Sequence, residues 1–267
     1  MENTVYTHDV LYEDLKKLKA DFPNLSLFSI GKSYVGRELY AAKLGNGSYK
    51  VFFSAAYHGT EWLTAKVLFE FIKELCKNPN LVENTSVYAV FMVNPDGVDI
   101  ASGGKNWQAN ANGVDINHNF DALWALSKQC ESKYSADKKG ATRFGGDYPE
   151  SEPETRAIAN FTRQNSFDTV IALHSQGEVI YYDFCGIVPD GTARLLDRFE
   201  AVSRYKRDIP DGIASYGGYK DWFIKKYKKP GFTIEIGLGE NPLPLSDFDN
   251  VYKGVFPILC EALKMEN

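Results

Sequence analysis

The stretch Val51–Glu61, VFFSAAYHGTE, decides the fold, because it joins a short strand to a helix through a histidine and a glutamate. Residues 51–55 are apolar or small and predict a strand, while the amphipathic run Trp62–Cys76 predicts a helix. His58 and Glu61 lie between them. At the carboxyl end of a strand, a histidine and a carboxylate three residues apart can direct a nitrogen and an oxygen at one point. Zn²⁺ takes such ligands tetrahedrally and keeps a position open for water when it is catalytic.

A plainer interpretation of these residues is a turn histidine beside a glutamate that suits the N-terminal dipole of a helix. The rest of the chain favours the metal site. The run Thr169–Leu173, TVIAL, predicts a second strand, which ends at His174, far along the chain from His58. Two of the four histidines in the chain therefore close apolar strands. His174 is the candidate third ligand of one metal ion per chain.

The composition is that of an ordinary globular protein. Of the 267 residues, 44% are hydrophobic and 24% are charged, and a chain of this length can bury a large core. Because the candidate ligands are spread along the sequence, we expect a single domain over residues 1–267. The net charge of −5 argues against a nucleic-acid partner, which would favour a basic face.

The termini and cysteines indicate where the chain resides. The N-terminus, MENTVYTHDVLYEDL, has neither a basic n-region nor an apolar h-region, and no apolar run reaches membrane-spanning length. The four cysteines lie far apart with no C-x-x-C pair, which is typical of reduced thiols. We expect a cytoplasmic protein without a membrane partner, and the sequence leaves its oligomeric state open.

Strand and helix patterns alternate along the chain. Strands are expected at 25–31, 38–44, 51–55, 86–93, 169–173, 180–184 and 232–236. Helices are expected at 10–20, 62–76, 151–165, 192–207, 217–227 and 251–264. Ser151 and Glu154 form a candidate capping box for the third helix. The segment Asn94–Gly97 (NPDG) predicts a turn, and long polar loops are expected at 99–113 and 127–153.

This order predicts an α/β fold with a mixed, largely parallel twisted sheet and helices on both faces. In such sheets the ligand site lies beyond the carboxyl ends of the strands, where His58 and His174 fall.

Glu235 lies inside the predicted strand FTIEI. Because strand residues alternate between faces, Glu235 and Thr233 share a side opposite Phe232, Ile234 and Ile236. A carboxylate there is either a structural ion-pair partner or a base directed into a site. A nearby zinc ion favours the second role, since zinc lowers the pKa of water from 15.7 to about 7. A carboxylate can then take the proton and pass it to a leaving amine.

Short motifs in a fixed order run through most of the chain. They are Ile30-Gly31-Lys32-Ser33 with Gly36-Arg37, His58-Gly59-Thr60-Glu61, Asn94-Pro95-Asp96-Gly97, Gly113-Val114-Asp115-Ile116-Asn117, Ser151–Glu154, Leu173-His174-Ser175, Gly217-Gly218 before Asp221-Trp222, and Phe232–Glu235. In order and spacing the sequence resembles the zinc metallocarboxypeptidases. That resemblance implies that His58, Glu61 and His174 bind zinc and that Glu235 is the catalytic carboxylate.

Four longer stretches are similar to one branch of that family, the γ-D-glutamyl-meso-diaminopimelate peptidases I. They are residues 106–122, 142–155, 172–184 and 232–248. Members of this branch trim bacterial cell-wall peptides and often carry wall-binding repeats ahead of the catalytic domain. The present chain has no such repeats.

Three positions depart from the digestive members of the family. Those enzymes follow the asparagine at Asn117 with an arginine that clamps the terminal carboxylate of the substrate, whereas His118 stands here and offers no bidentate fork. Gln108 aligns with the oxyanion-stabilising arginine, and Lys105 is the alternative. A substrate-contacting tyrosine corresponds either to Tyr216 or, by strict alignment, to Ile213.

Arg143 is a further candidate for holding substrate carboxylates, because it lies in a long polar loop. Surface ion pairing is the alternative role for its side chain.

The expected function is zinc-dependent hydrolysis of the γ-D-glutamyl–meso-diaminopimelate bond in muropeptides. Asn117, His118, Gln108, Arg143 and Tyr216 are its candidate substrate contacts. Three rivals stay open. They are a general zinc carboxypeptidase, a deacylase of small N-acyl amino acids, and a catalytically silent muropeptide-binding protein.

Overall fold

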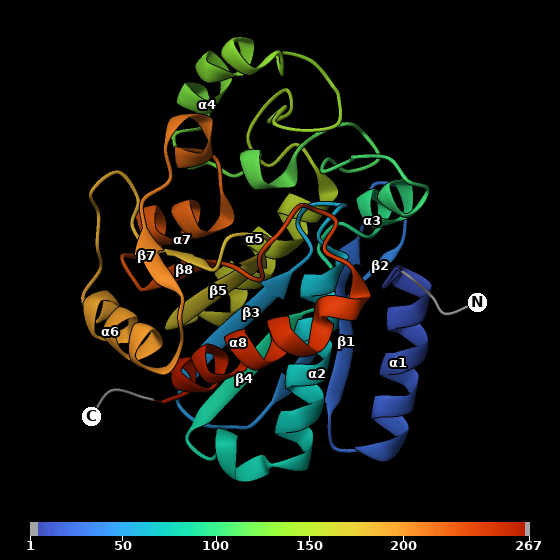
Figure 1. Cartoon of the computed structure of the whole chain (residues 1–267), viewed down its shortest axis with the longest axis vertical. Coiled ribbons are helices and arrows are strands. Elements are labelled where there is room, and N and C mark those ends of the chain that lie inside the picture. Colours follow the sequence, from blue (N-terminus) through green and yellow to red (C-terminus); the bar gives the residue numbers. More distant parts are fainter. Residues whose placement is uncertain (1–4, 265–267) are drawn as a thin grey trace.

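The computed structural model describes residues 5–264, so the ends of the predicted 1–267 domain lie outside the described residues. One eight-stranded sheet runs through this part of the chain in the order β1-β2-β4-β3-β5-β8-β6-β7 (Figure 1). The strands are β1 (Ser26–Lys32), β2 (Glu38–Leu44), β3 (Tyr49–Ala55), β4 (Thr85–Val90), β5 (Thr169–His174), β6 (Val179–Tyr181), β7 (Lys206–Asp208) and β8 (Gly231–Glu235). The helices are α1 (His8–Asp21), α2 (Trp62–Lys77), α3 (Pro95–Ser102), α4 (Trp124–Glu131), α5 (Pro153–Asn165), α6 (Thr192–Val202), α7 (Tyr219–Tyr227) and α8 (Phe248–Ala262).

The centre of the sheet is parallel and its margins are mixed. β3 pairs in parallel with both β4 and β5, and β5 pairs in parallel with β8. β2 joins β1 and β4 antiparallel, and β6 joins β8 antiparallel and β7 in parallel. The predicted mixed, largely parallel sheet is therefore confirmed, and β3 lies near its middle.

Helices cover both faces of the sheet, as predicted. Along β3, Val51 and Phe53 point into the core that α1, α2, α6 and α8 build on one face. Phe52 points into the second core, which α5 and α7 build on the other face. In Figure 1, α1, α2 and α8 lie in front of the sheet and α5 lies behind it. Among residues 5–264, no helix combines the length and apolar character needed to cross a membrane.

The turn predicted at Asn94–Gly97 is instead the start of α3. The Asn94 side chain caps this helix by accepting a hydrogen bond from the backbone N–H of Gly97 at 2.9 Å. Pro95 occupies the first helical position, where its missing N–H has no cost. The prediction was wrong because asparagine and proline favour helix starts as well as turns. The loop predicted at 99–113 consequently begins only after Ser102.

The loop predicted at 127–153 contains the end of α4 and a 3-10 turn at Ser132–Tyr134. Glu131, at the end of α4, is buried and accepts a hydrogen bond from the backbone N–H of Gly145 at 2.8 Å. It also pairs with Lys128 at 2.6 Å. This tertiary contact holds the polar segment against the helix. No periodic pattern in the sequence predicts it.

Some element ends were predicted too far along the chain. β4 stops at Val90 instead of 93, and β6 stops at Tyr181 instead of 184. The helix expected to reach 207 ends at Val202, after which β7 extends the edge of the sheet beside β6. The sequence of β7, KRD, has no alternating apolar residues. Charged residues suit an edge strand, but a search for apolar periodicity cannot find such a strand.

The capping box predicted at Ser151 and Glu154 is absent. The N-cap of α5 is Glu152, and its side chain makes no capping hydrogen bond. Glu154 is fully buried and accepts hydrogen bonds from the backbone N–H of Tyr34 at 2.7 Å and from the Asn110 amide at 3.1 Å. The carboxylate thus joins α5 to two loops instead of closing its own first turn.

Glu154 gives the fold a pH dependence. Burial raises the pKa of its carboxyl group to about 7 from an ordinary 4.5. A raised folded-state pKa means that the contribution to stability is fully present below about pH 4.5 and is lost as the pH rises through 7. We expect the free energy of unfolding of Glu154→Gln to fall less steeply between pH 6 and 8 than that of the wild type, by at most about 1.4 kcal/mol per pH unit.

Chemical denaturation at several pH values measures this difference. Glu150→Gln is the matched control, since Glu150 lies near the start of α5 and pairs with Arg163 at the surface. Parallel slopes for the wild type and Glu154→Gln would contradict the prediction.

Candidate metal centre and active site

Two neighbouring parallel strands bring His58 and His174 together. β3 and β5 pair in register up to Ala55 and Leu173, so their carboxyl ends meet at one edge of the sheet. His174 is the last residue of β5, and His58 lies just beyond β3. Gly59 lets the backbone of Gly97 approach this segment closely, because a Cβ at position 59 would lie 2.3 Å from the carbonyl oxygen of Gly97. The chain then enters α2, with Glu61 at its N-cap position.

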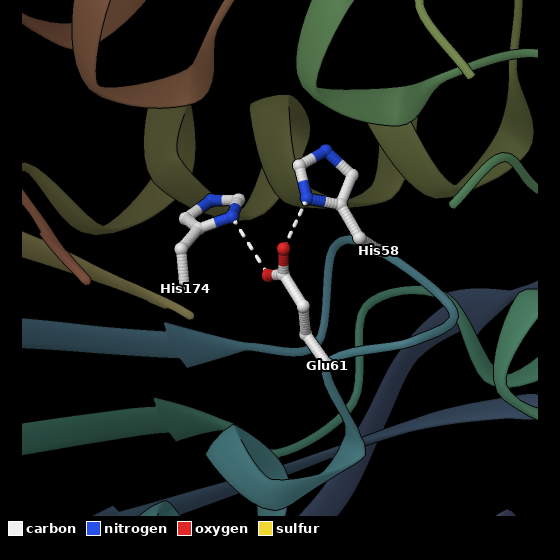
Figure 2. Close-up of side chains that lie close together, drawn as sticks. All are labelled: His58, Glu61 and His174. Atoms are coloured by element: carbon white, nitrogen blue, oxygen red, sulfur yellow. Dashed lines mark hydrogen bonds and ion pairs between the residues drawn. The ribbon is translucent and has the colours of Figure 1, made fainter. Parts of the chain in front are cut away.

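The three predicted ligands converge on one point, as Figure 2 shows. Glu61 lies between the two imidazole rings. Its Oε1 is 2.8 Å from Nδ1 of His58, and its Oε2 is 3.0 Å from Nδ1 of His174. One donor atom from each residue lies within 4.8 Å of the others, an arrangement that could hold a metal ion. Glu61 and His174 are buried, and His58 is nearly so.

The hydrogen-bond chemistry of this cluster fits a cation. Nε2 of His58 lies 3.2 Å from Oδ1 of Asp115, so carboxylates face both nitrogens of this ring. A carboxylate has no proton to give, and a neutral imidazole has only one. Either His58 carries an extra proton, or Nε2–H donates to Asp115 and the lone pair of Nδ1 faces a cation beside Glu61. The second arrangement is the histidine–carboxylate pairing that orients metal ligands in proteins.

The charges around the cluster also favour a bound cation. Burial alone would lower the pKa of His58, but the carboxylates of Glu61 and Asp115 outweigh it and raise the pKa well above its ordinary value. Burial opposes ionisation of Glu61, yet His58 and His174 lower its pKa to about 2. The site therefore keeps a carboxylate ionised in a buried place, which favours a bound positive charge.

Asp115 was not among the predicted site residues, although it lies inside the GVDIN motif. Its Oδ2 accepts a hydrogen bond from the backbone N–H of Arg143 at 2.9 Å, and its Oδ1 from that of Asn117 at 3.1 Å. We expect Asp115→Asn to weaken zinc binding about 10–100-fold, because a group that orients a metal-ligating histidine typically has this effect. Competition with a chelator of known zinc affinity measures the change. Asp99→Asn, which alters the pair of Asp99 with Arg37, is the control, and equal affinities in both variants would refute the role.

Glu235 lies beside the cluster in a small cleft. It ends β8 and is paired in register with His174 at the end of β5. Both residues line a cavity of about 200 Å³, together with His58. Thr233 lines it as well, so the predicted alternation of β8 is confirmed. Burial and the charge of Glu61 raise the pKa of Glu235 well above its ordinary value, although His58 opposes the shift.

Two of the predicted substrate contacts line the same cavity. Asn117 and His118 belong to the 3-10 turn Ile116–His118. Nδ1–H of His118 donates to the carbonyl oxygen of Tyr216 at 3.2 Å. Oδ1 of Asn117 accepts a hydrogen bond from the backbone N–H of Tyr219 at 3.1 Å, which fixes the start of α7 against the turn.

The other predicted contacts lie outside the cavity lining. The Gln108 amide oxygen accepts a hydrogen bond from the Thr142 hydroxyl. The guanidinium of Arg143 lies over the ring of Tyr134, 5.2 Å from its centroid. The alternative to Gln108, Lys105, is exposed. Substrate roles for Gln108, Arg143 and Tyr216 stay predictions.

Sequence reasoning missed four other residues that line the cavity. They are Tyr181, Asp211, Lys220 and Asp221. The sequence did contain a signal, a lysine next to an aspartate among the aromatic residues of α7. Lysine and aspartate are seldom buried, so a charged pair on a buried helix face indicates a functional site.

A larger hollow, of about 810 Å³, lies at the surface between α6 and α8. None of the predicted site residues lines it, so its size alone does not make it the active site.

Comparisons with known proteins agree with this geometry. Residues 11–257 match the family described as zinc carboxypeptidase. Gamma-D-glutamyl-L-diamino acid endopeptidase 1 of Lysinibacillus sphaericus is 34% identical over 97% of this chain and 72% of its own length. Carboxypeptidase A1 of Bos taurus is 25% identical over 87% of this chain and 62% of its own length.

A solved structure shares the fold. Bovine thrombin-activatable fibrinolysis inhibitor superposes with a TM-score of 0.83 at 22% identity, over 98% of this chain and 97% of that chain. The family match spans nearly the whole sequence, including His58, Glu61, His174 and Glu235. The chain therefore belongs to the zinc carboxypeptidase family, and it is a metallopeptidase whose cofactor is Zn²⁺.

Proposed function

We propose that this chain hydrolyses the γ-D-glutamyl–meso-diaminopimelate bond of bacterial cell-wall peptides, with residues 1–267 acting as one catalytic domain. The observation that carries the proposal is the 34% identity over 97% of the chain to a relative named as a γ-D-glutamyl-L-diamino acid endopeptidase. A cytoplasmic location remains a prediction from the sequence.

The charges of the cleft support a polar, zwitterionic substrate. Lys220 and Asp211 both line it, so its wall offers groups of either sign. Among residues 5–264 the lining contains no arginine, the residue best suited to a bidentate carboxylate clamp. Asn117 and His118 remain beside the cluster as single hydrogen-bonding groups. Such a cleft favours several separate polar contacts over one strong clamp on a terminal carboxylate.

The proposed ligands are His58, Glu61 and His174. When bound, a zinc ion supplies Lewis acidity, which polarises a carbonyl group and lowers the pKa of water to about 7. Asp115 keeps the ring of His58 oriented through Nε2, so that Nδ1 faces the metal position. Glu61 is held between the two rings and brings the negative charge of the ligand set.

Glu235 is the proposed proton carrier. It lines the cavity beside both histidines, where a scissile bond has to lie for hydrolysis. In this place its carboxylate accepts a proton from the attacking water and gives it to the leaving nitrogen. Asn117 and His118 line the same cavity and are the groups that hold the substrate in place.

A substrate panel tests the proposal. The zinc-loaded chain is given L-Ala-γ-D-Glu-meso-diaminopimelate, its L-lysine counterpart, hippuryl amino acids and N-acetyl amino acids, and the products are identified by mass spectrometry. We expect the diaminopimelate peptide to have the highest kcat/KM and to be cut only at the γ-D-glutamyl bond. Equal or better kcat/KM on the hippuryl or N-acetyl compounds would indicate a general carboxypeptidase or a deacylase, and binding of the peptide without turnover would indicate a silent binding protein.

A further inference from the structure

The two histidines of the metal centre are held in different ways. Nε2 of His58 lies 3.2 Å from Oδ1 of Asp115, and that carboxylate orients the ring. Nε2 of His174 is buried, and within the described residues, 5–264, no group makes a hydrogen bond to it. The contact of Nδ1 with Glu61 at 3.0 Å positions one nitrogen only. His174 therefore lacks the hydrogen bond that usually fixes a metal-ligating histidine.

The ring of Tyr57 lies against the imidazole of His174. The two ring centroids are 5.2 Å apart and the ring planes differ by 19°, which is a stacked arrangement. Tyr57 directly precedes His58 in the segment that follows β3, and it is completely buried. The segment that supplies one proposed ligand thus places an aromatic ring on another.

Tyr57 is itself firmly placed. Its hydroxyl group shares a hydrogen bond with the hydroxyl of Ser54 at 2.8 Å. Its carbonyl oxygen accepts a hydrogen bond from the side-chain amide of Asn94 at 3.0 Å. The ring of Tyr219 also stacks on it, with 6.0 Å between the centroids. A ring fixed through its hydroxyl, its backbone and its packing is a rigid support for the imidazole.

An aromatic ring offers His174 more than volume. Its flat face limits the tilt of a neighbouring ring, and that face carries a partial negative charge. An imidazole that binds a metal ion takes up part of the positive charge, and a positive group over an aromatic face is stabilised. An aliphatic side chain would fill the same core without either effect.

We propose that Tyr57 is a positioning residue for His174. Its ring holds the imidazole in the plane that directs Nδ1 at the metal position, and it stabilises the metal-bound form of that ring. This inference goes beyond the proposed function, because it rests on the proposed ligand set and not on the substrate.

The first measurement is the zinc dissociation constant, obtained by competition with a chelator of known affinity. Tyr57→Leu is expected to bind zinc about three- to tenfold more weakly, the factor that corresponds to one stacked aromatic pair. Tyr57→Phe keeps the ring and should stay within about twofold of the wild type. Phe167→Leu is the matched control, because Phe167 is fully buried in the same core but stacks on Phe52 at 4.8 Å.

The second measurement is the visible absorption spectrum of Co²⁺ in place of zinc, which reports the geometry of the ligands. Tyr57→Leu is expected to shift the Co²⁺ bands, whereas Tyr57→Phe and Phe167→Leu should leave them in place. A role in packing alone predicts a different pattern. Tyr57→Leu would then lower the free energy of unfolding of the metal-free chain, as Phe167→Leu does, and keep the zinc affinity and the Co²⁺ spectrum of the wild type.

Tyr57→Leu leaves the hydroxyl of Ser54 buried without its phenol partner and can fail to fold. The double variant Ser54→Ala/Tyr57→Leu removes both polar groups. Ser54→Ala/Tyr57→Phe is its matched partner, since it differs only in keeping the ring. Equal zinc affinity and equal Co²⁺ spectra in these two double variants would overturn the role of Tyr57.

The outcomes separate this inference from the proposed function. Full zinc retention in folded His174→Ala refutes the ligand set and, with it, the role of Tyr57. A chain that binds zinc through His174 but cleaves no γ-D-glutamyl peptide refutes the proposed function alone. Zinc that depends on His174 but is indifferent to the ring at position 57 refutes the role of Tyr57 alone.

Discussion

Replacing either His58 or His174 with alanine is expected to remove nearly all the zinc that the wild-type chain holds. Each histidine supplies one of three donors that lie within 4.8 Å of one another, and a catalytic zinc site uses three protein ligands. Two remaining ligands hold zinc too weakly to survive dialysis, so we expect less than about a tenth of an equivalent in either variant. Glu61→Gln should lose zinc only in part, since an amide oxygen is a poorer ligand than a carboxylate but keeps its position.

Metal analysis after dialysis against a weak chelator measures the loss, with circular dichroism to confirm folding. His118→Ala is the matched control, because His118 is a buried histidine of the same cavity whose Nδ1 is bonded to a backbone carbonyl. It should retain about one zinc per chain. Stoichiometric zinc in folded His58→Ala or His174→Ala would show that the ligand assignment is wrong.

The convergence of the three ligands could be predicted from the sequence because strand ends fix it. A short apolar strand followed by a histidine places the imidazole at one edge of a sheet, and parallel neighbours bring two such edges together. The pairing of β3 with β5 and of β5 with β8 then places His58, His174 and Glu235 side by side. Alternation along β8 gave the face of Glu235. These features depend on the alternation of apolar residues along each strand and on the order of the strands, and both can be read directly from a sequence.

The rest of the cavity lining depends on tertiary contacts, which the spacing of apolar residues in the sequence does not reveal. Lys220 reaches the cavity because α7 is held against the turn of Asn117, and its ammonium donates hydrogen bonds to the carbonyl oxygen of Asp183 and the carboxylate of Asp221. The same kind of contact removed two predicted substrate groups from the lining. Gln108 is bonded to Thr142, and Arg143 lies over Tyr134. Alignment fixed where these residues stand in the chain, but local partners decide where their side chains lie.

Helix starts were missed for a related reason. Asn94 and Pro95 favour both turns and helix N-termini, and the deciding hydrogen bond, from the Gly97 N–H to the Asn94 side chain, exists only once α3 has formed. Glu154 shows the opposite error. Its position three residues after Ser151 satisfies the capping pattern, but its carboxylate binds the loop of Tyr34 instead.

Replacing Glu235 with glutamine is expected to reduce turnover about 10²–10⁴-fold, the range typical of a general acid–base group. Glutamine has nearly the same volume and removes the site that holds a proton between water and the leaving nitrogen. The ligands His58, Glu61 and His174 are untouched, so zinc content should stay near one per chain. The expected signature is therefore a loss in kcat for the diaminopimelate peptide with folding, zinc and peptide binding preserved.

Glu240→Gln is the matched control, because Glu240 is an exposed carboxylate five residues further along the chain, beyond the end of β8. It should keep wild-type turnover. The alternative role of Glu235, a structural ion-pair partner, predicts the reverse pattern, in which the free energy of unfolding falls and activity per folded molecule survives. The surroundings of Glu235 argue against that role, because burial and the charge of Glu61 raise its pKa, His58 alone opposes the shift, and no ion pair with a lysine or arginine is found for it among residues 5–264. A drop in kcat of less than tenfold, with zinc retained, would show that Glu235 is not the proton carrier and would favour its structural role.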